Sequence, residues 1–221
     1  MSRYNPPMLT VETHCHTDAS GDCRVRVEDL IKTARQRGID RLVITDHNSI
    51  SGAVRAKQLD PELIIIGEEI MTEQGELLAF FVTEEVPRHL PPMEAIHILR
   101  EQGAYISVSH PFDPRRGWEL RALESIAPHV DAVEIFNARN IRPAYNEAAE
   151  RFATRFKLGG TAGSDAHTLI EVGRATMQVP EFTDAASLRA AMPLAQYTKR
   201  ASGPLIRLAS RYAAIVNRVS R

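Results

Sequence analysis

The stretch MLTVETHCHTDASGDC (8–23) is the most informative part of this 221-residue chain, because an apolar run leads directly into histidines and acids. Alternate residues of a strand face the same side, so we expect His14 and His16 to project together while Cys15 points elsewhere. A turn after the strand can return Asp22 to the same place. Two imidazoles and a carboxylate at one strand end can bind a divalent metal ion.

The same arrangement of an apolar run followed by polar side chains recurs along the chain. The later clusters are Asp46-His47 after 42–45, Glu68-Glu69 after 63–66, His110 after 106–109 and Asp165-x-His167 after 158–163, with Glu76 as a further carboxylate. Barrel enzymes build multimetal sites by bringing such residues to the ends of several strands at one mouth. The pattern therefore predicts a metallohydrolase.

Strand-like and helix-like segments alternate throughout the sequence. Apolar runs predict strands at 8–13, 41–45, 63–66, 77–82, 104–108, 131–136, 158–162 and 175–179. Apolar residues spaced three and four apart predict helices over 26–37, 92–102, 143–156 and 184–192. Alternating βα units favour an α/β fold with a parallel sheet, and seven or eight units suggest a closed or distorted barrel. An open doubly wound sheet is the alternative.

Composition places the chain among ordinary soluble proteins and leaves the substrate open. The net charge of −1 gives no general indication of nucleic acid or an acidic membrane surface as a partner. Cys15 and Cys23 are expected to be reduced thiols. Residues 1–7 have no apolar signal core, and no window reaches 18 uninterrupted apolar residues. We therefore predict a cytoplasmic protein.

The last part of the chain differs from the rest, so we divide the sequence into a catalytic domain over 1–198 and a basic amphipathic helix over 199–221. The second part carries six basic residues and no acidic one: Lys199, Arg200, Arg207, Arg211, Arg218 and Arg221. Apolar residues recur among them at helical spacing. This helix either docks on the barrel or contacts a partner, an anionic lipid surface or nucleic acid.

Five motifs together resemble a known family. HCHTDASGDC (14–23), ITDHNS (44–49), GEE (67–69), SVSHP (107–111) and GSDAH (163–167), in this order, resemble the PHP (polymerase and histidinol phosphatase) superfamily of phosphoesterases. The resemblance runs from about residue 9 to residue 179. It implies a distorted (β/α)7 TIM-like barrel that holds up to three divalent ions at the C-terminal mouth of its strands.

The resemblance also implies which residues bind the ions. By motif, the first metal has His14, His16 and Asp165, the second has Asp22, His47 and His167, and the third has His110, with Glu69 bridging the first and third. The family often supplies another histidine on the strand after the bridge, but the segment GELLAFFV (75–82) contains none. Glu76 is the nearest replacement, because a carboxylate can bind the same ions. Glu68 is expected to face away from Glu69, toward solvent or a supporting position.

The predicted reaction is hydrolysis of a phosphate ester by a metal-activated hydroxide, without a protein nucleophile. Zn²⁺, Mn²⁺ and Fe²⁺ all suit the predicted ligands, and two or three such ions are expected. The substrate is a small phosphomonoester, a nucleotide or a nucleic-acid end. Arg115, Arg116 and Arg139 follow strand ends, and their guanidinium groups are candidates for bidentate contact with phosphate oxygens.

Two other functions remain open at this point. An amidohydrolase-type metallohydrolase also begins with HxH on a first barrel strand, but that class usually has a metal-bridging lysine, and no lysine stands at a strand end here. A catalytically silent regulatory module that binds metal is the second alternative. A nearly complete ligand set argues against it, because a degenerate site would not keep so many costly polar groups together.

Overall fold

A computed structural model describes residues 7–203 of the chain. Its strands are β1 (Met8–Cys15), β2 (Arg41–Ile44), β3 (Ile64–Met71), β4 (Glu76–Phe80), β5 (Tyr105–Val108), β6 (Ala132–Asn137), β7 (Gly159–Gly163), β8 (Ala175–Pro180) and β9 (Gln196–Lys199). Its α-helices are α1 (Val27–Gln36), α2 (Ser51–Leu59), α3 (Pro92–Glu101), α4 (Leu120–Ile126), α5 (Pro143–Phe156) and α6 (Ala185–Ala191). Short 3-10 turns follow α4 at Ala127–His129 and α6 at Met192–Leu194.

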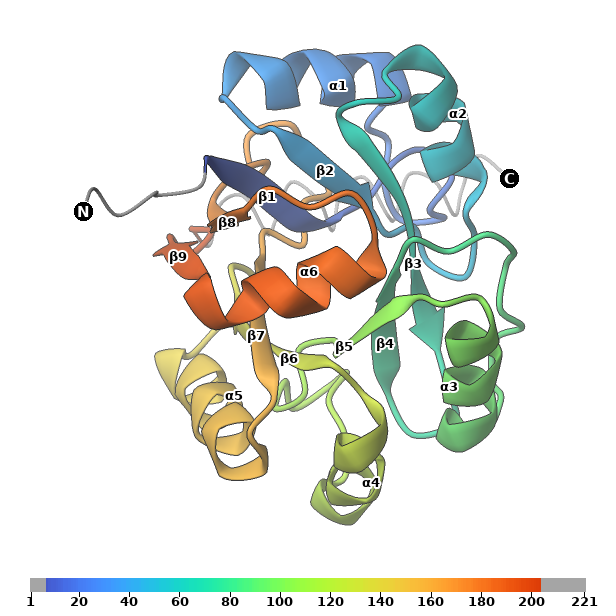
Figure 1. The fold of residues 1–221 in the computed structure, drawn as a ribbon, viewed down its shortest axis with the longest axis vertical. Helices are drawn as coiled ribbons and strands as arrows, with labels where there is room; N and C mark the ends of the chain where they lie inside the picture. The colour runs from blue at the N-terminus through green and yellow to red at the C-terminus, as the bar shows by residue number, and fades with distance from the viewer. Residues whose placement is uncertain (1–6, 204–221) are drawn as a thin grey trace, which may run out of the picture.

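The strands form one curled sheet in the order β7-β6-β5-β4-β3-β2-β1-β8-β9. The end of β1 meets the segment after β7, where the amide of His16 donates to the carbonyl of Ala166 at 2.9 Å and the amide of Ala166 donates to the carbonyl of His14. These bonds nearly close the sheet into a barrel (Figure 1). The predicted distorted α/β barrel is therefore confirmed, and the open doubly wound alternative is wrong.

Strand direction differs from the parallel sheet that the sequence suggested. The pairs β1–β2, β2–β3, β5–β6 and β6–β7 are parallel, whereas β4 runs antiparallel to β3 and β5, and β8 runs antiparallel to β1 and β9. A parallel neighbour needs a crossover of a dozen or more residues. The four residues 72–75 between β3 and β4 allow only a hairpin, so the first residue of β4 lies beside the last residue of β3.

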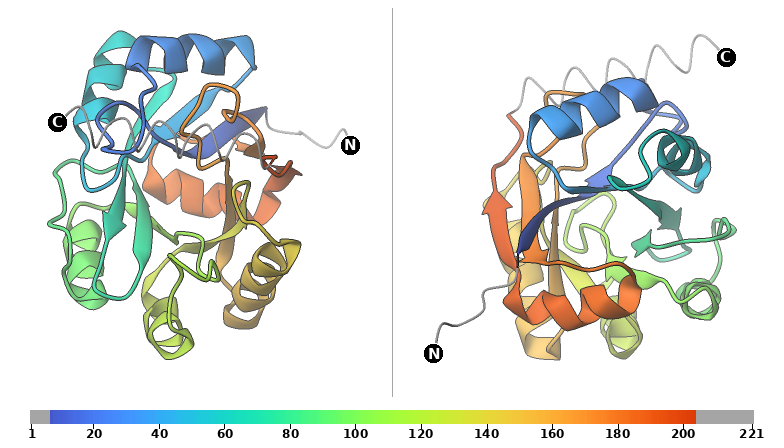
Figure 2. Two further views of the ribbon diagram at one scale, coloured as in Figure 1. Left: turned by 180° about the vertical axis from the view of Figure 1, so that it is seen from behind. Right: turned by 45° about the horizontal axis from the view of Figure 1, so that its top comes forward.

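Alternation along the strands separates the inside of the barrel from the helical layer. Val43, Ile65 and Phe80 belong to an apolar cluster that also contains residues of α6, while Leu42 and Ile64 pack in a cluster with α1 and α2. In Figure 1, α6 crosses one end of the barrel, and after a half-turn in Figure 2 it lies behind the strands. The opposite end, where the parallel strands finish, stays available for a site.

All eight predicted strands and all four predicted helices are present, but three elements were missed. Helix α2 buries Gly52, Ala53 and Ala56, and such small residues give little helical signal in the sequence. Helix α4 has seven residues, and β9 is a short edge strand of mostly polar sequence. Among residues 7–203, no helix is long and apolar enough to cross a membrane.

The predicted domain boundary at residue 198 falls inside the structure's last strand. β9 ends at Lys199, and the amide of Ser202 donates to the carbonyl of Ala138 at 2.7 Å, so residues 199–203 still contact the barrel. The rest of the basic helix predicted over 199–221 lies outside the described residues.

Asp131 links α6, α3 and β5 at the end of the barrel that α6 crosses. Its carboxylate accepts hydrogen bonds from Arg189 of α6 at 2.9 Å, from Arg100 of α3 at 2.8 Å and from the amide of Ile106 in β5 at 2.8 Å. Burial alone would raise the pKa of Asp131, but the bonds from Arg189 and Arg100 outweigh it and hold the pKa below its ordinary value. The charged form is therefore the one that stabilises the fold.

We predict that Asp131→Asn lowers the free energy of unfolding at pH 7 by about 2 kcal/mol, because two charge-assisted hydrogen bonds are weakened. A lowered pKa stabilises the fold above the unfolded-state pKa of about 4, and this contribution is lost as pH falls through the folded value. Urea unfolding should show a smaller difference in unfolding free energy between wild type and the variant at pH 3 than at pH 7. Asp29→Asn, at an exposed position, is the control. Equal stability of the Asp131 variant and wild type at pH 7 would contradict this role.

Candidate metal centre

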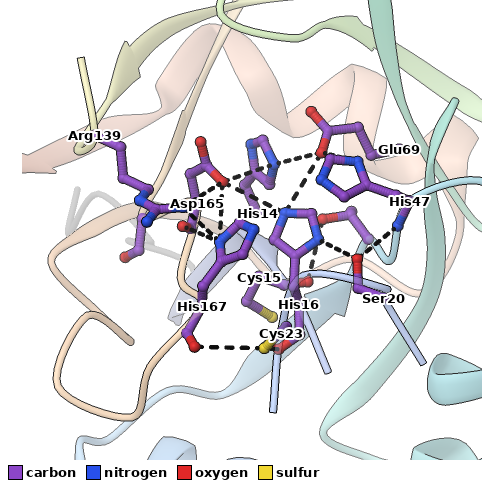
Figure 3. A network of polar contacts seen from close by, with 12 residues as sticks. His14, Cys15, His16, Ser20, Cys23, His47, Glu69, Arg139, Asp165 and His167 are labelled. Carbon is purple, nitrogen blue, oxygen red and sulfur yellow. Dashed lines mark hydrogen bonds and ion pairs between the residues drawn. The ribbon is translucent and has the colours of Figure 1, made fainter. Parts of the chain in front are cut away.

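Polar side chains from several strand ends converge at the mouth opposite α6, and Figure 3 shows a large part of them: His14, His16, His47, Glu69, Asp165 and His167. The structure brings together all nine residues that the sequence suggested as ligands: His14, His16, Asp22, His47, Glu69, Glu76, His110, Asp165 and His167. Most follow or finish a strand, whereas Glu76 begins β4. Because β4 runs antiparallel to its neighbours, Glu76 pairs with Met71 at the end of β3 and lies at the same mouth.

The first group of ligand atoms surrounds two carboxylate oxygens. The Nε2 atoms of His14 and His16 lie 3.2 and 3.4 Å from Oε2 of Glu69. The same two nitrogens lie 3.7 and 3.4 Å from Oδ1 of Asp165. All four side chains are fully buried. Two nitrogens and two oxygens thus enclose one small space.

Two further groups adjoin the first, and Nδ1 of His47 also lies 3.1 Å from Oε2 of Glu69. Oδ2 of Asp22 is 3.4 Å from Nε2 of His47 and 3.0 Å from Nε2 of His167, and this side is the exposed one, with 39% of the Asp22 side chain accessible. On the other side, Nε2 of His110 lies 3.1 Å from both Oε1 of Glu69 and Oε2 of Glu76. Glu69 therefore turns one oxygen toward each of two groups.

Several of these atoms are buried without any hydrogen-bond partner among the described residues. They are His14 Nε2, His16 Nε2, His47 Nδ1, Glu69 Oε2, Glu76 Oε2 and Asp165 Oδ1. Buried polar atoms are almost always satisfied, so a convergent set of unsatisfied ones indicates a missing partner. Imidazole nitrogens and carboxylate oxygens suit divalent Zn, Mn and Fe. The donor set therefore fits metal ions.

Opposite charges within the cluster shift one another's pKa values. Burial by itself would raise the pKa of Glu69, but His14 and His47 hold it well below its ordinary value, and Arg116 and His14 do the same for Asp165. Burial would lower the pKa of His47, yet Glu69 and Asp22 raise it to about 10. Glu69 and Asp165 are thus ionised and stabilised by nearby positive charge. Divalent ions would supply that charge more strongly than protonated histidines do.

His16 is the exception among the imidazoles. Burial lowers its pKa, and the neighbouring His167 and His47 lower it further, to about 3. Its ring centroid lies 4.2 Å from that of His167 and 4.6 Å from that of His47. A neutral imidazole is the form that binds a metal ion, so His16 is ready to act as a ligand without losing a proton.

The three arginines predicted near phosphate lie in different surroundings. The guanidinium of Arg116 places both terminal nitrogens 3.0 Å from Oδ2 of Asp165. Arg139 contacts His167 Nδ1 at 2.8 Å and pairs with Glu171 at 3.2 Å. The Arg115 side chain is exposed, and within residues 7–203 it makes no hydrogen bond or ion pair with the cluster. Only two of the three therefore reach the mouth.

Some supporting residues were missed in the sequence. Glu171 accepts a hydrogen bond from the amide of His167 at 3.0 Å, and Glu134 lies against His14. A charged residue inside the apolar run 131–136 was the available signal for Glu134. Glu68 does face away from Glu69, as expected, but it is buried and accepts a hydrogen bond from the amide of Val86 at 3.1 Å rather than facing solvent.

The chain belongs to the PHP family, which confirms the resemblance seen in its motifs. The family model described as PHP domain matches residues 12–110, and the model described as PHP-associated matches residues 143–192. An uncharacterized protein of Methanocaldococcus jannaschii is 34% identical over 146 residues, which are 59% of this chain and 82% of that protein.

Two further comparisons extend over more of the chain. A protein of Vibrio campbellii that bears the name probable phosphatase is 28% identical over 214 residues, covering 80% of this chain and 84% of the relative. Among solved structures, PsfC from Pseudomonas syringae has the same fold with a TM-score of 0.70 at 19% identity, covering 97% of this chain and 99% of that one.

We predict that Mn²⁺ or Zn²⁺ raises the unfolding temperature of the chelator-treated protein. An ion that binds only the folded state adds about 2.7 kcal/mol of stability at a concentration one hundred times its Kd. The double variant His14→Ala/His16→Ala should lose most of this shift, because two nitrogens of the first group are removed. Thermal unfolding with and without each ion tests this. An unchanged wild-type unfolding temperature with Mn²⁺, Zn²⁺ and Fe²⁺ would contradict a metal centre.

Proposed function

We propose that this protein is a metal-dependent phosphoesterase that hydrolyses small phosphomonoesters, nucleotides or nucleic-acid ends at the barrel mouth. The observation that carries the proposal is the placement of Glu69 between two groups of unsatisfied ligand atoms. Membership of the PHP family and the name of the Vibrio campbellii relative support a phosphate ester as the substrate.

The ligand groups suggest how two or three ions would be held. The first position has His14, His16, Glu69 and Asp165, the second has Asp22, His47 and His167, and the third has Glu69, Glu76 and His110. Divalent Zn, Mn or Fe ions bound there would polarise the ester and lower the pKa of water toward neutrality. The exposed side at Asp22 and His47 gives water and substrate their access.

Arg116 and Arg139 are placed to hold the phosphate oxygens. A guanidinium has five N–H donors, and Arg116 directs two of its nitrogens at a single oxygen of Asp165, so other donors remain for a ligand. About a third of its side chain is exposed, at 32%. Arginine matches the geometry of phosphate and keeps its charge at every relevant pH. The two side chains would orient the ester and neutralise negative charge that develops on its oxygens.

The cysteines near the cluster support a reaction without a covalent protein intermediate. Cys15 directs its thiol to the carbonyl of Val43, and Cys23 directs its thiol to the carbonyls of His16 and His167. Burial raises the pKa of the Cys15 thiol well above its ordinary value, so it is not a thiolate. A thiol that is buried and protonated is a poor nucleophile.

The direct test is a phosphatase panel with added Mn²⁺, Zn²⁺ or Fe²⁺, using p-nitrophenyl phosphate, mononucleotides and short oligonucleotides with 3′- or 5′-phosphates. We predict hydrolysis by the wild-type protein and at least a thousandfold lower kcat/KM for His14→Ala and Asp165→Ala, both still folded by circular dichroism. Metal-dependent activity retained in both variants would show that the ligand assignment is incorrect. No hydrolysis of any phosphate ester by the metal-loaded wild type would refute the proposed function.

A second test addresses the arginines. We predict that Arg116→Ala and Arg139→Ala each reduce kcat/KM by about tenfold to a hundredfold, since a charge-assisted hydrogen bond contributes about 1.5–3 kcal/mol. Arg121→Ala is the matched control, because Arg121 is an exposed arginine on α4. Steady-state kinetics on the best substrate decide the outcome. Unchanged kcat/KM in both test variants would exclude these side chains as phosphate ligands.

A further inference from the structure

Glu134 is a fully buried carboxylate in β6 that contacts the ring of His14. None of the three ligand groups includes it. Burying a carboxylate is costly unless hydrogen bonds compensate. Its two oxygens therefore need donors, and the structure places those donors on residues of the metal centre.

One oxygen of Glu134 orients the ring of His14. Oε1 lies 2.8 Å from Nδ1 of His14, on the side of the ring opposite Nε2. A carboxylate accepts a hydrogen bond, so Nδ1 carries a proton, and in the neutral ring Nε2 is then the nitrogen with the free lone pair that a metal ion needs. Nε2 lies 3.2 Å from Oε2 of Glu69 and 3.7 Å from Oδ1 of Asp165. The contact thus fixes both the tautomer and the direction of the ring.

The other oxygen of Glu134 holds the opposite side of the centre. Oε2 accepts hydrogen bonds from the amide of His110 at 2.8 Å and from Nδ2 of Asn137 at 2.9 Å. His110 has a φ angle of 21°, which is unusual for a residue other than glycine and needs support from its surroundings. Asn137 Nδ2 also lies 3.2 Å from Oδ2 of Asp165. One carboxylate therefore connects three proposed ligands.

Gly163 leaves the space that this arrangement needs. A Cβ atom at Gly163 would lie 2.3 Å from Cβ of His14 and 2.8 Å from Oε1 of Glu134. Both distances are far below van der Waals contact, so any larger residue would push the two side chains apart. The close approach of β7 to β1 and β6 thus depends on a residue without a side chain.

Resting on the proposed function, we propose that Glu134 is a positioning residue that couples the first and third metal positions. It sets the ring of His14 for the first position and the backbone of His110 for the third. Supporting groups of this kind typically change metal affinity by about tenfold to a hundredfold. Because both bonds come from one carboxylate, loss of Glu134 weakens binding at both positions together.

The test is Mn²⁺ binding to Glu134→Gln, measured by isothermal titration calorimetry and by metal content after dialysis. Glutamine has one acceptor oxygen and one NH₂ group, so it cannot accept from His14 and His110 at once. We expect Mn²⁺ affinity at least tenfold weaker than in wild type and a lower metal content per chain. Glu68→Gln is the matched control, because Glu68 is a buried carboxylate that faces away from the cluster. It should bind Mn²⁺ like wild type.

Wild-type affinity and metal content in a folded Glu134→Gln protein would overturn the proposal, as would an equal loss in Glu68→Gln. If Glu134→Gln does not fold, Glu134→Asp decides the matter, since it keeps the charge and both oxygens but withdraws them by one methylene. Affinity equal to wild type in that variant would also overturn the proposal. Metal binding that depends on Glu134 in a protein without phosphatase activity would refute the proposed function and leave this inference standing.

Discussion

The buried carboxylate of Glu69 is the constraint around which the barrel mouth is built. It lies within 3.5 Å of four imidazoles and also accepts a hydrogen bond from Ser109 at 2.7 Å. A carboxylate removed from water is unfavourable unless opposite charges and donors surround it. Here the surrounding groups come from strands that are far apart in sequence. The site is therefore stable only when the barrel brings them together.

Two irregularities of the barrel bring polar side chains to this mouth. The register of β1 shifts between Glu12 and Cys15, near the residues that turn their imidazoles inward. Bulges of this kind commonly re-aim side chains near active sites. The reversal of β4 brings Glu76 to the mouth from the start of a strand, where a parallel strand would have carried it to the far end. A regular parallel barrel would offer fewer ligands at one place.

Much of the site could be predicted from sequence because its ligands follow strand ends. Apolar runs located the strands, and polar residues directly after them were placed correctly at one mouth. The antiparallel orientation of β4 and β8 was not predicted, because an apolar run locates a strand without showing whether it runs parallel or antiparallel to its neighbours. Arg115 and Arg116 are neighbours in one loop, and only its folded path decides which side chain reaches Asp165. Glu134 was not predicted, because it lies inside an apolar run and its role depends on contacts with His14 and His110, which are distant in sequence.

If Glu69 has the role inferred from its contacts, the barrel mouth binds at least two divalent ions with Glu69 between them. Anomalous diffraction from crystals of the Mn²⁺-loaded protein, collected at the manganese edge, tests it most directly. We expect two or three peaks about 3.5–4 Å apart, with Glu69 contributing an oxygen to two of them. A single peak, or peaks away from Glu69, would contradict it.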